Sequence, residues 1–180
     1  MRLRRRRPPW WLPVGTVVAL GAIVALLVWP SRSNDRPART TSLRVADLPA
    51  AVRALETRLG APQRYTEIKA TVDGVSMFVA LDDARDVPWF YRAGVLEGPG
   101  APQPVGTFGA FSLAGVAIDK ASAVAGAALA QFDRAELEQF SLQNLADAGV
   151  VWSLSLRSAK GGRIDVTFTP QGEARGAEMR

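Results

Sequence analysis

The residue types that carry most enzyme chemistry are missing from this chain. Its 180 residues include neither cysteine nor histidine. Histidine is the commonest general base near neutral pH and, with cysteine, the commonest zinc ligand. The composition therefore excludes Ser-His-Asp and Cys-His mechanisms, zinc hydrolysis, disulfides and a lipidated cysteine.

A serine–lysine pair is the nucleophilic arrangement that needs no histidine, and it requires a desolvated lysine as the base. The lysines are Lys69, Lys120 and Lys160. Lys69 alternates with apolar residues, Lys120 adjoins a helix start and Lys160 adjoins a Gly-Gly turn, so all three are expected to be exposed. No pair among the 17 acids stands out as the carboxylates of a glycosidase. Catalysis is not expected.

Three acids, Asp82, Asp83 and Asp86, lie close together in the sequence. Carboxylate oxygens at this density could hold Ca²⁺. Arg85 lies among them and no EF-hand spacing follows, which favours a solvated turn, with calcium as the alternative. The glycines form no phosphate-binding motif, because no Gly-Lys-Ser/Thr is present. No metal and no cofactor are expected.

An aromatic run, Trp89, Phe90 and Tyr91, is the best candidate for a partner-contact site. Successive side chains of a strand point to opposite faces, so at least one ring must point away from the core. Exposed aromatic rings anchor interfaces because they bury a large area with little loss of entropy. Ordinary packing in a sheet is the alternative. The loop from Gly98 to Gly109 extends the predicted contact region.

Positive charge is concentrated at the N-terminus. The formal net charge is +5, from 22 Lys+Arg and 17 Asp+Glu. Five arginines precede Trp10, so the other 17 basic residues (22 − 5) balance the 17 acids. A balanced body lacks the surplus that binding to phosphates requires, so no nucleic-acid partner is expected. The arginine cluster is expected to meet anionic lipid headgroups.

The N-terminus also predicts a membrane anchor. The uncharged stretch from Trp10 to Trp29 would form a helix of about 30 Å, the hydrocarbon thickness of a bilayer. The preceding arginines predict a cytoplasmic N-terminus; they are Arg2, Arg4, Arg5, Arg6 and Arg7. Indole rings suited to the membrane interface stand at Trp10, Trp11 and Trp29. A cleaved signal peptide is the alternative, but the apolar stretch is long and no Ala-x-Ala-like site follows it.

Apolar spacing predicts a helix from Asp47 to Leu59 and a second from Asp119 to Phe132, each with an aspartate as N-cap. Gly60 and Pro62 should end the first helix. Pro170 and Gly172 should end the ordered part. Strands are predicted at 64–72, 75–81, 87–91, 137–145, 150–156 and 163–169. Asp73-Gly74 should form the hairpin turn between the first two strands, and a short extension, Val95-Leu96, should follow the third.

The two halves share a pattern. Ser42-Leu43, Val45 and Asp47 before the first helix recur as Ser112-Leu113, Val116 and Asp119 before the second. The predicted fold class is therefore α+β, an N-terminal transmembrane helix plus an exported domain of two αβββ repeats, each a helix packed on an antiparallel sheet. The predicted domains are a cytoplasmic tail (1–9), a transmembrane helix (10–29), a linker (30–41), a first unit with its loop (42–109) and a second unit with a C-terminal tail (110–180).

This arrangement resembles the PepSY-like, beta-lactamase-inhibitor-like domains of bacterial envelope proteins. The resemblance rests on the helix entries at Ser42 to Asp47 and Phe111 to Asp119, and on Tyr91-Arg92-Ala93-Gly94-Val95. The second unit departs from that pattern, with Thr169-Pro170-Gln171-Gly172 at the equivalent place. The resemblance implies a module that binds or restrains proteins at the cell surface without catalysis.

The functional hypothesis is a membrane-anchored, extracytoplasmic and non-catalytic binding module of the bacterial cytoplasmic membrane. Its partners would be the lipid bilayer and an envelope protein. One alternative is a structural accessory subunit of a membrane complex, recognised through the small residues Gly15, Ala19, Ala22 and Ala25 of the anchor. An envelope hydrolase is the other alternative, which a buried carboxylate pair or a buried lysine beside a serine would support.

Overall fold

Two short α-helices and ten β-strands make up the part of the chain that the computed structural model describes, residues 43–132, 134–159 and 161–179. These residues belong to the second of two units into which the chain divides, Ala38–Arg180.

The first helix, α2 (Leu48–Leu59), follows a single 3₁₀ turn, η1 (Val45–Asp47). It buries Leu48, Val52 and Leu55 on one face, as the spacing predicts. Gly60 ends it with φ 77°, a left-handed conformation that glycine adopts at little cost. The predicted N-cap is wrong in detail, because the Asp47 side chain makes no capping hydrogen bond.

The second helix, α3 (Ala121–Gln131), also follows a 3₁₀ turn, η2 (Ile118–Lys120). Its buried face is made of small side chains, Ala121, Val124, Ala125 and Ala128. Asp119 lies within η2, so it does not cap α3, whose N-cap position is Lys120.

All ten strands join one sheet with antiparallel pairings, in the order β10-β9-β8-β7-β1-β2-β3-β4, with β5 beside β3 and β6 beside β1. The pairing of β1 with β7 fuses the two halves of the chain into this single sheet. The strands are β1 (Arg64–Ala70), β2 (Val75–Ala80), β3 (Arg85–Arg92), β4 (Val95–Glu97), β5 (Gln103–Pro104), β6 (Phe111–Ser112), β7 (Glu136–Leu145), β8 (Gly149–Arg157), β9 (Arg163–Phe168) and β10 (Ala174–Met179).

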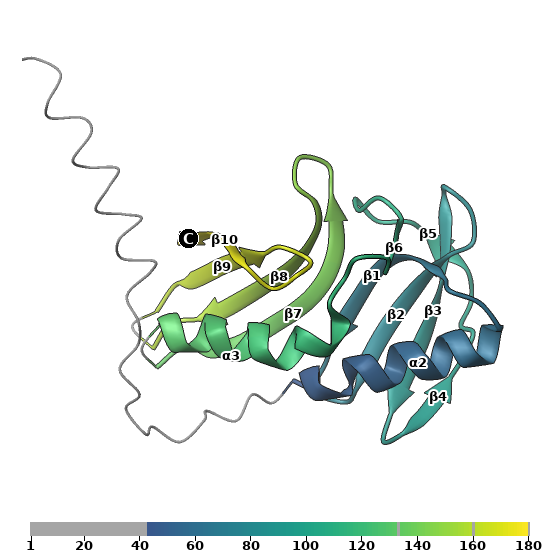
Figure 1. Ribbon diagram of the computed structural model, residues 1–180, viewed down its shortest axis with the longest axis horizontal. Helices are drawn as coiled ribbons and strands as arrows, with labels where there is room; N and C mark the ends of the chain where they lie inside the picture. The colour runs from purple at the N-terminus through teal and green to yellow at the C-terminus, as the bar shows by residue number, and fades with distance from the viewer. Residues whose placement is uncertain (1–42, 133, 160, 180) are drawn as a thin grey trace, which may run out of the picture. The chain divides into compact units, whose positions relative to one another are not determined.

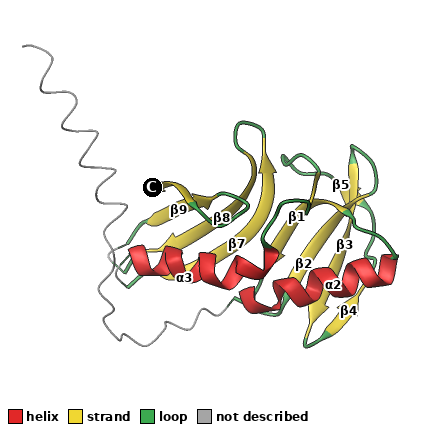
Figure 2. Ribbon diagram, in the orientation of Figure 1, coloured by secondary structure: helices red, strands yellow, loops and turns green. Residues whose placement is uncertain are grey.

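Both helices lie on the same face of the sheet, α2 in front of the strands of the first half and α3 in front of those of the second (Figures 1 and 2). The core fills the space between these two layers. One row of paired residues crosses six strands on this face: Trp89, Met77, Ile68, Leu142, Trp152 and Phe168. The described residues place no helix on the opposite face, which is called the open face below.

A β-bulge in β1 changes which side chains reach the core. The register shifts between Tyr65 and Glu67, so Tyr65 joins Ile68 on the helix-covered face instead of Glu67 on the open face. Simple alternation along a regular strand would place Tyr65 on the same face as Glu67, and the bulge overrides it. Tyr65 is fully buried, and its hydroxyl donates to Glu56 Oε1 of α2 over 3.4 Å.

The predicted fold class, a transmembrane helix plus two αβββ repeats, is corrected. The described chain is mostly one antiparallel sheet with two short helices, and each helix is followed by four strands of the main sheet rather than three. The added strands are β4 and β10, while β5 and β6 lie between the halves. No helix within the described residues is long and apolar enough to cross a membrane. The span predicted over 10–29 lies outside the described residues, as do Trp10, Trp11, Trp29 and the five arginines.

Candidate binding site

The aromatic run on β3 does not form one exposed surface. Trp89 faces the helices and is only 6% exposed, so its ring is not available to a partner. Tyr91 lies on the same face, half-buried against the core. Phe90 points to the open face, which confirms that one ring of the three turns away from the core. The Arg92 guanidinium lies over the Phe90 ring, 5.3 Å from its centroid.

The predicted contact loop from Gly98 to Gly109 packs along the outer side of β3. Gly100 N–H donates to Pro88 O over 2.8 Å, and Val105 N–H donates to Ala84 O over 2.9 Å. A Cβ at Gly98 would lie 3.0 Å from the Trp89 ring. This segment therefore covers the edge of β3 beyond β4, and part of it is the short strand β5.

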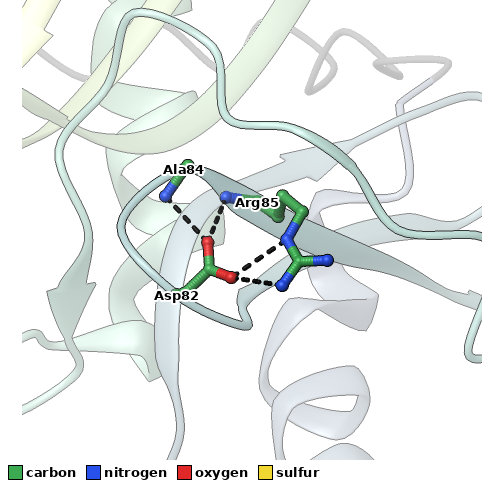
Figure 3. A network of polar contacts seen from close by, with 3 residues as sticks. All are labelled: Asp82, Ala84 and Arg85. Atoms are coloured by element: carbon green, nitrogen blue, oxygen red, sulfur yellow. Dashed lines mark hydrogen bonds and ion pairs between the residues drawn. The ribbon is translucent and has the colours of Figure 1, made fainter.

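Asp82 organises the turn between β2 and β3 (Figure 3). Its Oδ1 accepts from the backbone N–H groups of Ala84 (2.9 Å) and Arg85 (2.8 Å), and its Oδ2 accepts from the Arg85 guanidinium (2.6 and 2.9 Å). The hydrogen bonds from the Arg85 side chain and then from the Ala84 backbone lower the pKa of Asp82. Asp86 is buried and bonded elsewhere, so the three aspartates do not converge. Within the described residues, no three potential metal ligands gather at one place.

Asp86 belongs to a second polar cluster, on the open face. Its Oδ2 accepts from Thr66 Oγ1 over 2.7 Å, whereas its Oδ1 is buried and has no hydrogen-bond partner in the described structure. Glu67 lies nearby, and burial raises the pKa of its carboxyl. The Lys69 charge partly offsets this rise, and repulsion from Asp86 adds to it. Glu67 is only half-buried, so these two carboxylates are not the buried pair that would support an envelope hydrolase. Sequence reasoning did not bring them together.

Lys69 lies between two serines, since its register partners are Ser76 on β2 and Ser141 on β7. It is half-buried, so the expectation of full exposure is wrong. Its charge acts on the Glu67 carboxylate. The arrangement is that of a charge pair on a sheet face, whereas a Ser–Lys nucleophile requires a lysine that is desolvated without a counter-charge. Lys120 is exposed, and Lys160 lies outside the described residues.

The two outer strands of the sheet differ sharply. β4 has three residues and is followed by Gly98, Pro99, Pro102 and Pro104, which continue along β3. β10 has six residues, all of them exposed, and no described strand lies beyond it. Met179 near its end is 82% exposed. A proline-free edge of this kind presents a row of backbone N–H and C=O groups to any extended chain.

Sequence reasoning missed β10, which lies after the predicted end of order at Pro170 and Gly172. Its sequence, ARGAEM, contains no β-branched or aromatic residue, so strand propensity gave no signal. Pairing with β9 from Ala174–Phe168 to Met179–Ile164 forms it instead. The best available clue was the Gln171-Gly172 turn after an alternating strand.

Comparison with known proteins found no match for this chain. No protein-family model, no curated protein and no solved structure matches the chain. The geometry of the described residues is therefore the basis for a function.

Proposed function

We propose that this chain is a non-catalytic binding module at the outer face of a bacterial cytoplasmic membrane, and that an extended segment of a partner protein adds to its sheet at β10. Anchoring through residues 10–29 and outward orientation rest on the sequence. The open edge of β10 supports the mode of binding.

Strand addition fits this edge for a physical reason. In an antiparallel sheet, every second residue of an edge strand directs its N–H and C=O outward, where only water or another strand can satisfy them. Main-chain hydrogen bonds then supply affinity, and alternate side chains supply specificity. The opposite edge is protected by prolines and by β5, so only one edge is open to this mode among the described strands.

Two neighbouring proline variants test the proposal. Successive residues of β10 direct their N–H groups alternately toward β9 and outward, so Gly176→Pro and Ala177→Pro remove one donor of each kind. The variant that removes the outward donor should keep the circular dichroism and thermal unfolding of the parent and lose most partner binding. The other variant should also loosen the pairing of β10 with β9.

Partner binding would be measured in cells by photo-crosslinking from Met179, with Leu81 at the β2–β3 turn as a matched exposed control site. A specific adduct from Met179 that disappears in the outward-donor variant supports strand addition. Equal adducts from both sites, or an adduct unchanged by either proline, would reject it.

The location and the accessory-subunit alternative need separate tests. A periplasmic reporter fused after residue 180 should be active, and activity of a cytosolic reporter there would reject outward orientation. Replacing residues 10–29 by a neutral Leu/Ala span should preserve partner binding; loss of binding would favour recognition through the anchor.

A further inference from the structure

We propose that the partner segment that adds to β10 carries large apolar side chains at alternate positions, directed to the helix-covered face, and small or polar side chains directed to the open face. This inference rests on the proposed strand addition and names the chemistry of the added segment. Two features carry it, the chemistry of the two faces of β10 and that of the helix beside it.

The two faces of β10 differ in chemistry. Residues that pair directly across neighbouring strands share a face of the sheet. The β10 residues on the helix-covered face are apolar: Ala174, Ala177 and Met179. Those on the open face are Gly176 and Glu178, whose partners on β9 are polar. A strand that continues this sheet therefore meets apolar groups on one face and polar groups on the other.

Side-chain size falls at β10 along the rows that cross the second half of the sheet. Two rows on the helix-covered face hold large apolar residues as far as β9 and end in alanine on β10: Leu142-Trp152-Phe168-Ala174 and Phe140-Leu154-Val166-Ala177. Both alanines are exposed, whereas the β9 residues beside them are buried. An alanine methyl group occupies little space beside such residues, so a large side chain of an added strand has room to pack over it.

The helix beside β10 has an uncharged outer surface. The start of α3 lies at the turn between β9 and β10, where a Cβ at Gly172 would lie 3.0 Å from Val124 Cγ2. Ala127 follows Val124 by three positions, so it lies on the same side of α3. The exposed residues of α3 are all uncharged: Ser122, Ala123, Gly126, Ala127, Ala130 and Gln131. A helix side that faces water is normally rich in charge, so this composition favours contact with apolar groups.

The charged residues of β10 are directed elsewhere. Arg175 falls in the register shift of the strand, and its guanidinium donates to Ala148 O in the β7–β8 turn over 2.6 Å. Glu178 lies on the open face, opposite Asp165. Charged side chains on the inner face are a common protection of edge strands, and the helix-covered face of β10 has none.

Two labelled peptides test the chemistry of the segment, with the full chain in lipid nanodiscs. One peptide alternates threonine with valine, isoleucine and phenylalanine. The other has the same composition with its apolar residues consecutive, and both end in two lysines for solubility. By fluorescence anisotropy, the alternating peptide should bind at least about tenfold more tightly, because only it directs every apolar side chain to one face.

Neighbouring lysine variants assign the face. Ala177→Lys places an ammonium group among the apolar side chains of the segment and should weaken binding of the alternating peptide about tenfold. Gly176→Lys places the same group on the open face, where a Cβ would make only an ordinary contact with Thr167 Oγ1 at 3.9 Å. It should change the affinity by less than about threefold. Circular dichroism of both variants should match that of the parent.

Equal affinities of the two peptides, or equal losses in the two lysine variants, would overturn the inference. If both peptides also lost binding in the outward-donor proline variant, strand addition itself would stand. Failure of both peptides to bind would overturn the inference too, while crosslinking from Met179 in cells tests strand addition independently. A Met179 adduct at twice the mass of the chain that disappears in the outward-donor variant would place a second copy at this edge and likewise overturn the inference.

Discussion

The two halves of the sheet pack against helices of different kinds. In the first half, α2 supplies large side chains such as Leu48 and Leu55, and the strands beneath it also present large ones: Tyr65, Ile68, Met77 and Trp89. In the second half, α3 supplies mostly alanine, and the strands present large aromatic side chains: Phe140, Trp152 and Phe168.

The difference therefore lies in the helices, because the strands of both halves present large side chains to the core. Protein interiors are filled to nearly the density of organic crystals, so a helix with small side chains must lie over large strand residues. In the second half, Phe140 and Trp152 pack with ring centroids 5.3 Å apart. The core of that half should therefore depend mainly on its strands, and the core of the first half on both its helix and its strands.

Removing the central ring of the second half should have the largest effect. Trp152 is fully buried, and its Nε1 donates to Pro170 O over 3.4 Å. Trp152→Ala should lower the free energy of unfolding by about 3–5 kcal/mol, measured by urea denaturation. Trp89→Ala in the first half should cost less, because the Trp89 Nε1 has no partner to lose within the described structure. The reverse order would contradict the comparison.

Truncating the helix of the first half should come next. Leu55 of α2 is fully buried, so Leu55→Ala should cost about 2–5 kcal/mol by the same measurement. Leu59→Ala on the same helix serves as the control, because Leu59 is exposed and its loss should change stability by less than about 1 kcal/mol. Equal losses at the two positions would show that α2 does not carry the core of its half.

Enlarging the small helix should destabilise by overpacking. Ala128 of α3 is fully buried, so Ala128→Leu should cost about 1–3 kcal/mol. Ala127→Leu is matched in chemistry and lies on the exposed side of α3, where the change should stay within about 0.5 kcal/mol. If Ala128→Leu raised the melting temperature, α3 would lie over a cavity and the volume argument would fail for this half.

The smallest expected effect is a pH dependence of the folding stability that arises from Glu67, on the open face of the first half. The pKa of Glu67 is raised in the folded state, so the folded protein binds this proton more tightly than the unfolded chain. Its contribution to stability is therefore present at low pH and lost as pH rises from 4.5 through the raised pKa. Glu67→Gln should remove this loss and increase stability at neutral pH.

Denaturation at a series of pH values would measure the effect. Glu136→Gln provides the reference for removing one exposed carboxylate from the second half. If the free energy of unfolding changed with pH in the same way for the parent and Glu67→Gln, Glu67 would be solvated in the folded protein.

Local patterns predicted most individual elements. The stripe Leu48, Val52 and Leu55 located α2. The Asp73-Gly74 turn located the β1–β2 hairpin, and Gly60 located a helix end. These features depend on a few neighbouring residues, which a sequence displays directly.

Features set by distant partners were not predicted. The bulge at Tyr65 arises where β1 pairs with both β2 and β7, and alternation along β1 alone cannot reveal it. The Thr66–Asp86 hydrogen bond joins β1 to β3 across β2, so their sequence separation hid half of the polar cluster. β10 forms on the template of β9 without strand propensity of its own. A three-strand unit was inferred because β4 has only three residues and β10 has no residue of high strand propensity.

The antiparallel ladder between β1 and β7 ties the halves through the backbone, so the peptide that connects them is not what keeps them together. A protease cut at the exposed residues Ala101 or Pro102 would leave two fragments in one particle. They would migrate together on a sizing column and separate only in denaturant. Such a nicked protein would retain the β10 edge, so the connecting loop is a site for inserting a tag or a second domain.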